Sequence, residues 1–397
     1  IARRQRQMCI RDSSKSATEA GTEAGSETMR SGQFDIDYAK QVTKLADYSG
    51  IAITVSNDYE INDTAKQKYL TNVLQSYGAD AYKQVTDRDT VADGDYVKVD
   101  YTGYKDGKAF DGGSATDVML DVTNNSQVGG SSFIDGFTKP IIGAKVGEKV
   151  KGDVTFPEDY GNDDLNGQTV TFEYTVKGIY SADPVALADM TDEQVNTVFG
   201  KAGVTTNAQL TTQIEKDLKQ QLYSAEVDKI KSYMIENSTV EIPDEYLQAR
   251  LNEYIASFTK ENVKDGQTLK KYLKSNYNMT VDQATEKWKE NLTDQIKTEF
   301  IFGLIAEKEN IKMDDDGFNS YVDYIVSASN GQFSKASEVY KYFGSGHKDE
   351  GKTYLKNQYL VNKAIDTVTE KANVTFEDGS AAPVSYTHLT LPTSDLV

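Results

Sequence analysis

The chain has 397 residues, a length that favours two or three domains over one hydrophobic core. Its 43 basic and 62 acidic side chains give a formal charge of −19, which argues against nucleic acid or an anionic membrane surface as a partner. One cysteine and two histidines argue against a disulfide framework, a histidine triad and a metal site, so we expect neither metal nor cofactor.

The two ends of the chain differ in composition from their neighbours. Residues 1–12 and 384–397 match nothing next to them and are left out of the fold prediction. Residues 13–32 are rich in Ser, Thr, Glu, Ala and Gly without an apolar period, which predicts a solvated linker. We therefore expect a foreign N-terminus with a polar linker over 1–32 and a foreign, disordered tail over 379–397.

A mixed segment follows over residues 33–92. The apolar run at 51–55 predicts a short strand, and residues 62–76 predict a helix. The apolar stripe of this helix consists of Tyr69, Leu70, Val73 and Leu74. We expect this segment to connect the parts of the chain and to pack with the helical domain described below.

Residues 93–180 contain four segments in which apolar and polar side chains alternate, a pattern typical of strands with one buried face. The apolar positions are Val97, Val99 and Tyr101; Val118, Leu120 and Val122; Val150, Val154 and Phe156; and Val170, Phe172, Tyr174 and Val176. Turn residues lie at 105–107, 112–113 and 146–148. A short helix is predicted at 137–142, where Pro140 is tolerable only in the first turn. The pattern predicts a small antiparallel sheet wrapped on one short helix.

After residue 179 the chain reads as helical to about residue 372, and we expect a helical domain over 181–378. Thr205 and Thr206 can cap a helix of about thirty residues, and Pro243 and Thr280 mark two further helix starts. The remaining predicted helices cover 269–273, 314–327, 337–343 and 352–371. The acidic run at 314–316 resembles the start of a calcium loop, but Ile325 occupies its twelfth position, so we expect a helix cap there.

The strand-rich region resembles the FKBP family of peptidyl-prolyl isomerases. The motifs that carry this resemblance are YTGYKDGKAFDGG at 101–113, FIDGF at 133–137, IIGAKVGEK at 141–149 and FPEDYG at 156–161. They are most similar to the isomerase domain of trigger factor, and the helices after 181 resemble its C-terminal chaperone domain, which SurA-type foldases share in outline. The basic ribosome-docking domain of trigger factor has no counterpart before residue 33, so the resemblance argues against ribosome binding. The expected fold is α+β, with an FKBP-like sheet and an elongated all-α chaperone domain.

The resemblance implies a peptidyl-prolyl cis-trans isomerase and folding chaperone. Its pocket would be formed by Tyr101, Phe110, Asp111, Phe133, Ile134, Tyr160 and Phe172, with Phe137 as the floor. Tyr160 would donate its hydroxyl to a substrate carbonyl, and Asp111 would bias the surroundings of that carbonyl. Phe137 stands where many members of the family have tryptophan. The segment 123–132 is longer and richer in Gly and Ser than is usual in the family.

The expected partners are unfolded or nascent polypeptides with exposed X–Pro bonds and apolar segments. One alternative is a holdase chaperone without enzymatic activity, and another is a cytosolic trigger factor truncated at its N-terminus. The polar linker resembles the tether of bacterial surface lipoproteins, which implies a tethered location outside the cytoplasm and a role in protein transport. Cys9 is not the lipidated cysteine, because no apolar signal precedes it.

Overall fold

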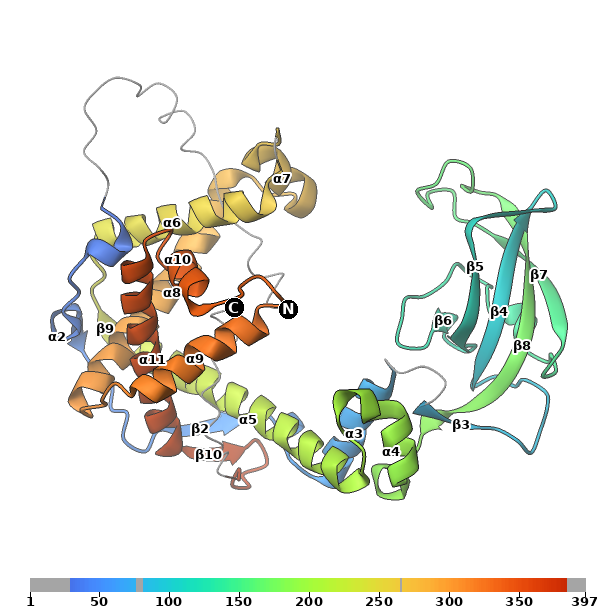
Figure 1. Ribbon diagram of the computed structural model, residues 1–397, viewed down its shortest axis with the longest axis horizontal. Helices are drawn as coiled ribbons and strands as arrows, with labels where there is room; N and C mark the ends of the chain where they lie inside the picture. Colours follow the sequence, from blue (N-terminus) through green and yellow to red (C-terminus); the bar gives the residue numbers. More distant parts are fainter. Residues whose placement is uncertain (1–28, 76–80, 265, 384–397) are drawn as a thin grey trace. The chain divides into compact units, whose positions relative to one another are not determined.

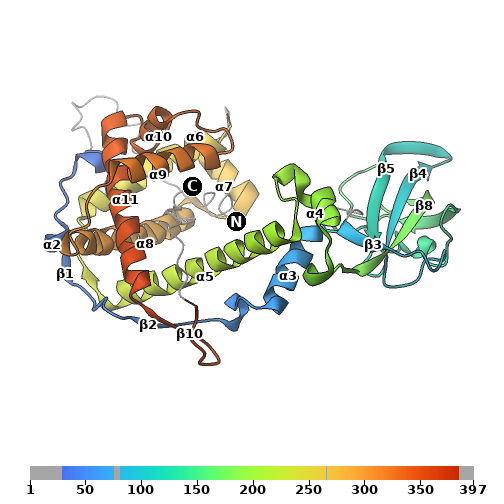
Figure 2. The same cartoon turned by 60° about the horizontal axis from the view of Figure 1, so that its bottom comes forward.

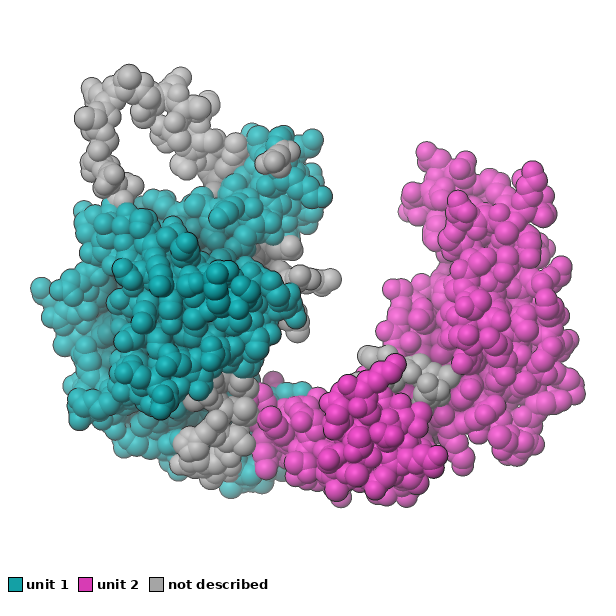
Figure 3. Space-filling view, viewed as in Figure 1, with its two compact units in different colours: residues 1–57, 221–397 teal, residues 58–220 magenta. Residues whose placement is uncertain are grey.

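The computed structural model describes residues 29–75, 81–264 and 266–383. The chain divides into two compact units, one made of residues up to 57 and from 221 onward, the other of residues 58–220 (Figure 3). Helix α5 (Asn207–Asn237) contributes residues to both units. Cys9, most of the predicted linker and the end from 384 lie outside the described residues.

Residues 58–220 contain a twisted, antiparallel sheet with the strand order β3-β8-β4-β5-β6, in which β7 also pairs with β8 (Figure 1). The strands are β3 (Tyr82–Gln84), β4 (Asp95–Lys105), β5 (Lys108–Asp121), β6 (Ser126–Gln127), β7 (Lys149–Thr155) and β8 (Thr169–Pro184). The four predicted strands are therefore confirmed. Their alternating apolar side chains form one core, in which Val97, Val99 and Leu120 are fully buried.

Two details of the predicted sheet are corrected. The expected helix at 137–142 is a single 3₁₀ turn, η4 (Lys139–Ile141). Pro140 lacks an N–H, and Gly136 and Gly143 on either side have positive φ, so a regular helix cannot extend. Gly112 and Gly113, predicted to separate strands, lie inside β5, where Gly112 has a φ of +77°.

A second core in the same unit joins helices to the sheet. Helix α3 (Asp63–Leu74) confirms the predicted helix and buries Leu70 and Leu74. Helix α4 (Asp192–Phe199), which the sequence analysis missed, buries Val195 and Phe199 in the same cluster. The cluster also contains Met119 of β5 and the first turns of α5. The short 3₁₀ turns nearby are η2 (Asn57–Tyr59), η5 (Leu187–Asp189) and η6 (Gly200–Ala202).

The other unit is mainly helical (Figures 1 and 2). Besides α5, its helices are η1 (Ser31–Gln33), α2 (Tyr38–Gln41), α6 (Asp244–Asn262), α7 (Leu269–Tyr277), α8 (Val281–Lys308), α9 (Asp315–Ala328), α10 (Ala336–Phe343) and α11 (Lys348–Glu370). The predicted helices are confirmed, although α7 and α11 are longer than expected. Asp314 caps α9 through its side chain, as predicted.

Short strands connect distant parts of this unit. The predicted strand β2 (Ala52–Val55) pairs in parallel with β10 (Asn373–Phe376), and β1 (Val42–Lys44) pairs with β9 (Thr239–Val240). Beyond β10 the chain turns back, since Ala382 donates its N–H to the carbonyl of Val374. In the described part of the chain, no helix is both long and apolar enough to cross a bilayer.

A buried ion pair joins three helices of this unit. Arg250 on α6 donates hydrogen bonds of 2.8 and 3.0 Å to the carboxylate of Glu299 on α8. Its guanidinium also lies 5.4 Å from the ring centre of Tyr354 on α11. The two charged side chains are only 11% and 13% exposed, so each depends on the other for compensation of its charge.

Replacing Arg250 by Met should lower the free energy of unfolding by about 3 kcal/mol, because the Glu299 carboxylate is left buried without a positive charge beside it. Urea unfolding can be followed by the fluorescence of Trp288, the only tryptophan of the chain, which is buried on α8. The control is Lys297→Met, which removes a solvent-exposed ion pair with Asp294 and should cost less than about 1 kcal/mol. Equal losses in the two variants would contradict the role given to Arg250.

Candidate active site

Phe137 lies at the centre of a group of aromatic rings inside the sheet. Its ring stacks on Phe133 at 4.3 Å between ring centres and meets Phe172, Tyr101 and Tyr174 edge to face at 4.9, 5.1 and 5.4 Å. We call these five residues the aromatic cluster. Phe137 is only 2% exposed, so its own ring is covered by the others and chiefly by the stacked Phe133.

Tyr174 on β8 forms a hydrogen bond with the backbone of Phe137. The Tyr174 hydroxyl donates a buried hydrogen bond of 2.6 Å to the carbonyl oxygen of Phe137. Burial raises the pKa of Tyr174 well above its ordinary value, so the hydroxyl keeps its proton at any physiological pH. One strand residue therefore fixes the chain at the floor of the site.

A second group of rings continues from the aromatic cluster towards solvent. Phe110 contacts Phe172 at 5.9 Å and Phe156 at 6.2 Å, and Phe156 contacts Tyr160 at 4.6 Å. Gly103 and Gly113 make room for the Phe110 ring, because a Cβ on either would lie 2.6 Å from it. The glycines of the YTGY and DGG motifs thus have a packing function.

Tyr160 is the exposed member of this series, with 48% of its surface accessible. The loop that carries it is closed by local hydrogen bonds, including one from the Tyr160 N–H to the Pro157 carbonyl, and is anchored by buried Leu165. Burial raises the pKa of Tyr101, and the nearby Tyr160 raises it further. The Tyr101 hydroxyl therefore keeps its proton at physiological pH.

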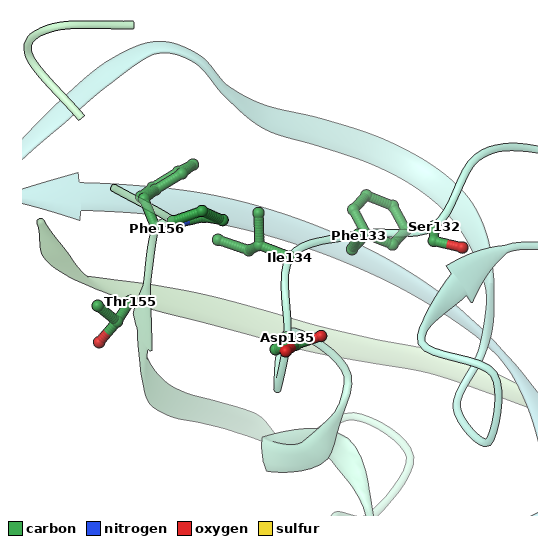
Figure 4. A pocket seen from close by; sticks show the side chains of 7 residues that line it. Ser132, Phe133, Ile134, Asp135, Thr155 and Phe156 are labelled. Atoms are coloured by element: carbon green, nitrogen blue, oxygen red, sulfur yellow. The ribbon is translucent and has the colours of Figure 1, made fainter. Parts of the chain in front are cut away.

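A cavity of about 510 Å³ opens beside these rings. It is lined by Ser132, Phe133, Ile134, Asp135, Thr155, Phe156 and Pro157. Figure 4 shows Ile134 and Phe156 on separate segments of the wall, with Phe133 next to Ile134, while Asp135 and Thr155 point the other way. The lining thus combines the apolar side chains of Phe133, Ile134, Phe156 and Pro157 with three polar ones.

The structure brings most of the predicted site residues together. Phe133 and Ile134 line the cavity, and Phe133 also belongs to the aromatic cluster with Tyr101, Phe137 and Phe172. Phe110 and Tyr160 join through Phe156. Asp111 is different, since it is exposed and its carboxylate makes no hydrogen bond or ion pair with another described residue.

Two residues of the site were not predicted as such. Phe156 was assigned to the core, and it is indeed buried, yet one side of it lines the cavity. Tyr174 was counted as a core position of its strand. The sequence signal for its role was a polar hydroxyl on a buried strand face, because such a group needs a hydrogen-bond partner. The strand pattern alone could not identify the Phe137 carbonyl as that partner.

Comparisons with known proteins give the same division of the chain. Residues 88–177 match the family described as FKBP-type peptidyl-prolyl cis-trans isomerase, and residues 205–370 match the C-terminus of bacterial trigger factor protein. The first match contains all the motifs quoted above, and the second covers most of the predicted helices after residue 181.

Similar whole proteins are trigger factors. That of Agathobacter rectalis is 27% identical over 330 residues, which cover 82% of this chain and 69% of the relative. That of Clostridium botulinum (strain Eklund 17B / Type B) is 29% identical over 276 residues, 70% of this chain and 62% of the relative. The chain therefore spans between about three fifths and seven tenths of these relatives. A solved structure described as "Promiscuous Substrate Recognition in Folding and Assembly Activities of the Trigger Factor Chaperone" aligns with 82% of this chain and 72% of its own, at 18% identity and a TM-score of 0.42.

Replacing Tyr174 by Phe should destabilise the sheet by about 1–3 kcal/mol, because the buried carbonyl of Phe137 loses its hydrogen-bond donor while the packing volume is kept. Hydrogen exchange of the β4 and β8 amides measures this loss. The matched control is Tyr104→Phe on β4, where the hydroxyl makes no hydrogen bond with a described residue. Equal protection in the two variants would show that the Tyr174 hydroxyl contributes nothing.

Proposed function

We propose that the chain, which is similar to trigger factors and contains an FKBP-type isomerase region, isomerises X–Pro bonds of unfolded polypeptides at the aromatic cluster around Phe137. The observation that carries this proposal is the placement of Phe137. Its ring is enclosed by Tyr101, Phe133 and Phe172, and Phe133 also lines the neighbouring cavity.

The chemistry requires no nucleophile and no cofactor. Rotation about an amide bond has a barrier of about 18–20 kcal/mol, since resonance must be broken, and uncatalysed X–Pro exchange takes tens of seconds or longer. The twisted amide has less charge separation than the planar one. An apolar surface that excludes water therefore stabilises the transition state relative to the ground state. The cavity wall of Phe133, Ile134 and Phe156 provides such a surface.

Two polar groups near the rings would act on the substrate backbone. The Tyr160 hydroxyl is exposed and would donate a hydrogen bond to a substrate carbonyl. The Asp111 carboxylate, which has no described partner, would bias the electrostatic surroundings of the same carbonyl. Both roles rest on the resemblance of the motifs and on the exposure of the two groups.

The helical unit is the candidate for holding unfolded clients. At the junction of α6, α7 and α8, several half-buried apolar side chains pack against the buried cluster that contains Trp288. These side chains are Leu247, Tyr254, Ile255, Leu269, Tyr272 and Tyr277. Such a surface suits apolar segments of a client, and a holdase activity there would be separable from isomerisation.

We also propose that the protein acts outside the cytoplasm, in protein folding during transport, and without the ribosome. The tether-like composition of residues 13–32 and the charge of −19 support this proposal. Sequencing the gene upstream tests it. A signal peptide with a lipidation cysteine would support export, whereas a basic ribosome-docking domain would make the chain a cytosolic trigger factor.

The activity itself is tested by the refolding rate of a protein limited by a cis-proline step. The chain should accelerate this step, and Tyr160→Phe should lower kcat/KM by about 2- to 10-fold through the loss of one hydrogen bond. Asp111→Asn should also lower it, while Asp106→Asn, an exposed carboxylate at the β4–β5 turn, serves as the control. Suppressed aggregation without any acceleration would rule out the isomerase and leave the holdase.

A further inference from the structure

The Gly- and Ser-rich segment 123–132 is folded. It is hydrogen-bonded to strand β5 before it and to residues 133 and 134 after it. Strand β6 pairs with β5 through Asp121–Ser126 and Leu120–Gln127. The segment closes on itself through the bridge between Ser126 and Ser132. Its length is therefore used to build a small structure beside the pocket.

One side chain of this segment, Asn125, holds the backbone of residues 133–138, which we call the pocket segment. Its amide nitrogen donates to the carbonyls of Phe133 at 3.1 Å and Ile134 at 2.9 Å. Its amide oxygen accepts from the Thr138 N–H at 2.9 Å and from the Thr138 hydroxyl at 3.1 Å. The Asn125 carbonyl also accepts from the Phe133 N–H at 2.9 Å.

Asparagine suits this position for two reasons. Asn125 has a φ of +49°, in the left-handed region that asparagine tolerates better than most residues. Its amide is also a donor and an acceptor at once, so a single side chain satisfies backbone groups of both kinds. The pocket segment contains no regular helix or strand, since the turn η4 begins only after it, and it therefore depends on such side-chain bonds.

The same segment is anchored on its other side to the core of α3. Val128 is 8% exposed and packs in the cluster that contains Leu70 and Leu74. Its N–H donates to the Met119 carbonyl at 3.0 Å, and Gly129 approaches the backbone carbonyl of Gln75 closely. The segment thus links the pocket to a helix outside the sheet.

We propose that Asn125 is a positioning residue for the isomerase site. Building on the proposed function, it acts through the pocket segment, where it fixes Phe133 and Ile134 in the cavity wall and Phe137 at the floor. Segment 123–132 supplies these hydrogen bonds through Asn125, and its contacts with the α3 cluster through Val128 fix its position.

The test compares Asn125→Asp with Asn124→Asp. The first variant keeps the acceptor for Thr138 but replaces two donated hydrogen bonds by repulsion from two carbonyls. The second adds the same charge one residue away, where the amide bonds only to Asp121 among the described residues. Asn125→Ser, which retains one donor, should be intermediate. The probe is a short peptide with a single Leu–Pro bond, for which KM, kcat and Kd are measured.

Misplacement of the pocket should raise KM and Kd of Asn125→Asp by about tenfold and leave those of Asn124→Asp within about twofold. A purely structural role would lower the folded fraction, and hence the apparent kcat, without changing KM or Kd. Equal KM and Kd in both aspartate variants would therefore overturn the proposal. If the wild-type chain binds the peptide without isomerising it, the proposed function fails, while the Kd comparison still decides the role of Asn125. Absence of peptide binding would contradict both.

Discussion

The site depends on satisfying the backbone of a segment that has almost no regular secondary structure and lies against an apolar core. A buried carbonyl without a partner costs about 1–3 kcal/mol, and three carbonyls of residues 133–138 accept hydrogen bonds from side chains elsewhere in the chain. Tyr174 on β8 donates one of these hydrogen bonds, and Asn125 in segment 123–132 donates two. The aromatic floor stays in place because polar side chains hold the chain beneath it.

In this arrangement, different side chains order the pocket segment and contact the substrate. The polar groups that order the pocket segment are buried or half-buried and point into the protein. The surface left for a substrate is made mainly of rings and aliphatic side chains, with Tyr160 exposed at its margin. A reaction whose transition state is less polar than its ground state is favoured by such a surface.

The sequence alone predicted much of this fold, because alternating apolar residues define strands and because Thr206, Thr280 and Asp314 mark helix starts. It predicted too much regularity at 137–142, where Pro140 and two positive-φ glycines allow only one 3₁₀ turn. The pairing of β2 with β10 could not be foreseen, since the two strands are more than 300 residues apart and no local pattern encodes that contact. For the site, motifs identified the aromatic residues. The hydrogen bonds of Asn125 and Tyr174 depend on the register of segments that only the tertiary structure brings together.

The most direct test of the central claim is NMR exchange spectroscopy on a peptide with one X–Pro bond. Catalytic amounts of the chain should speed cis–trans exchange, and the peptide should shift the resonances of Tyr101, Phe133 and Phe137 before any others. The Phe137→Ala chain, provided that it retains the sheet, should lose most of this acceleration. Exchange at the uncatalysed rate, or peptide-induced shifts confined to the helical unit, would contradict the assignment of the aromatic cluster as the active site.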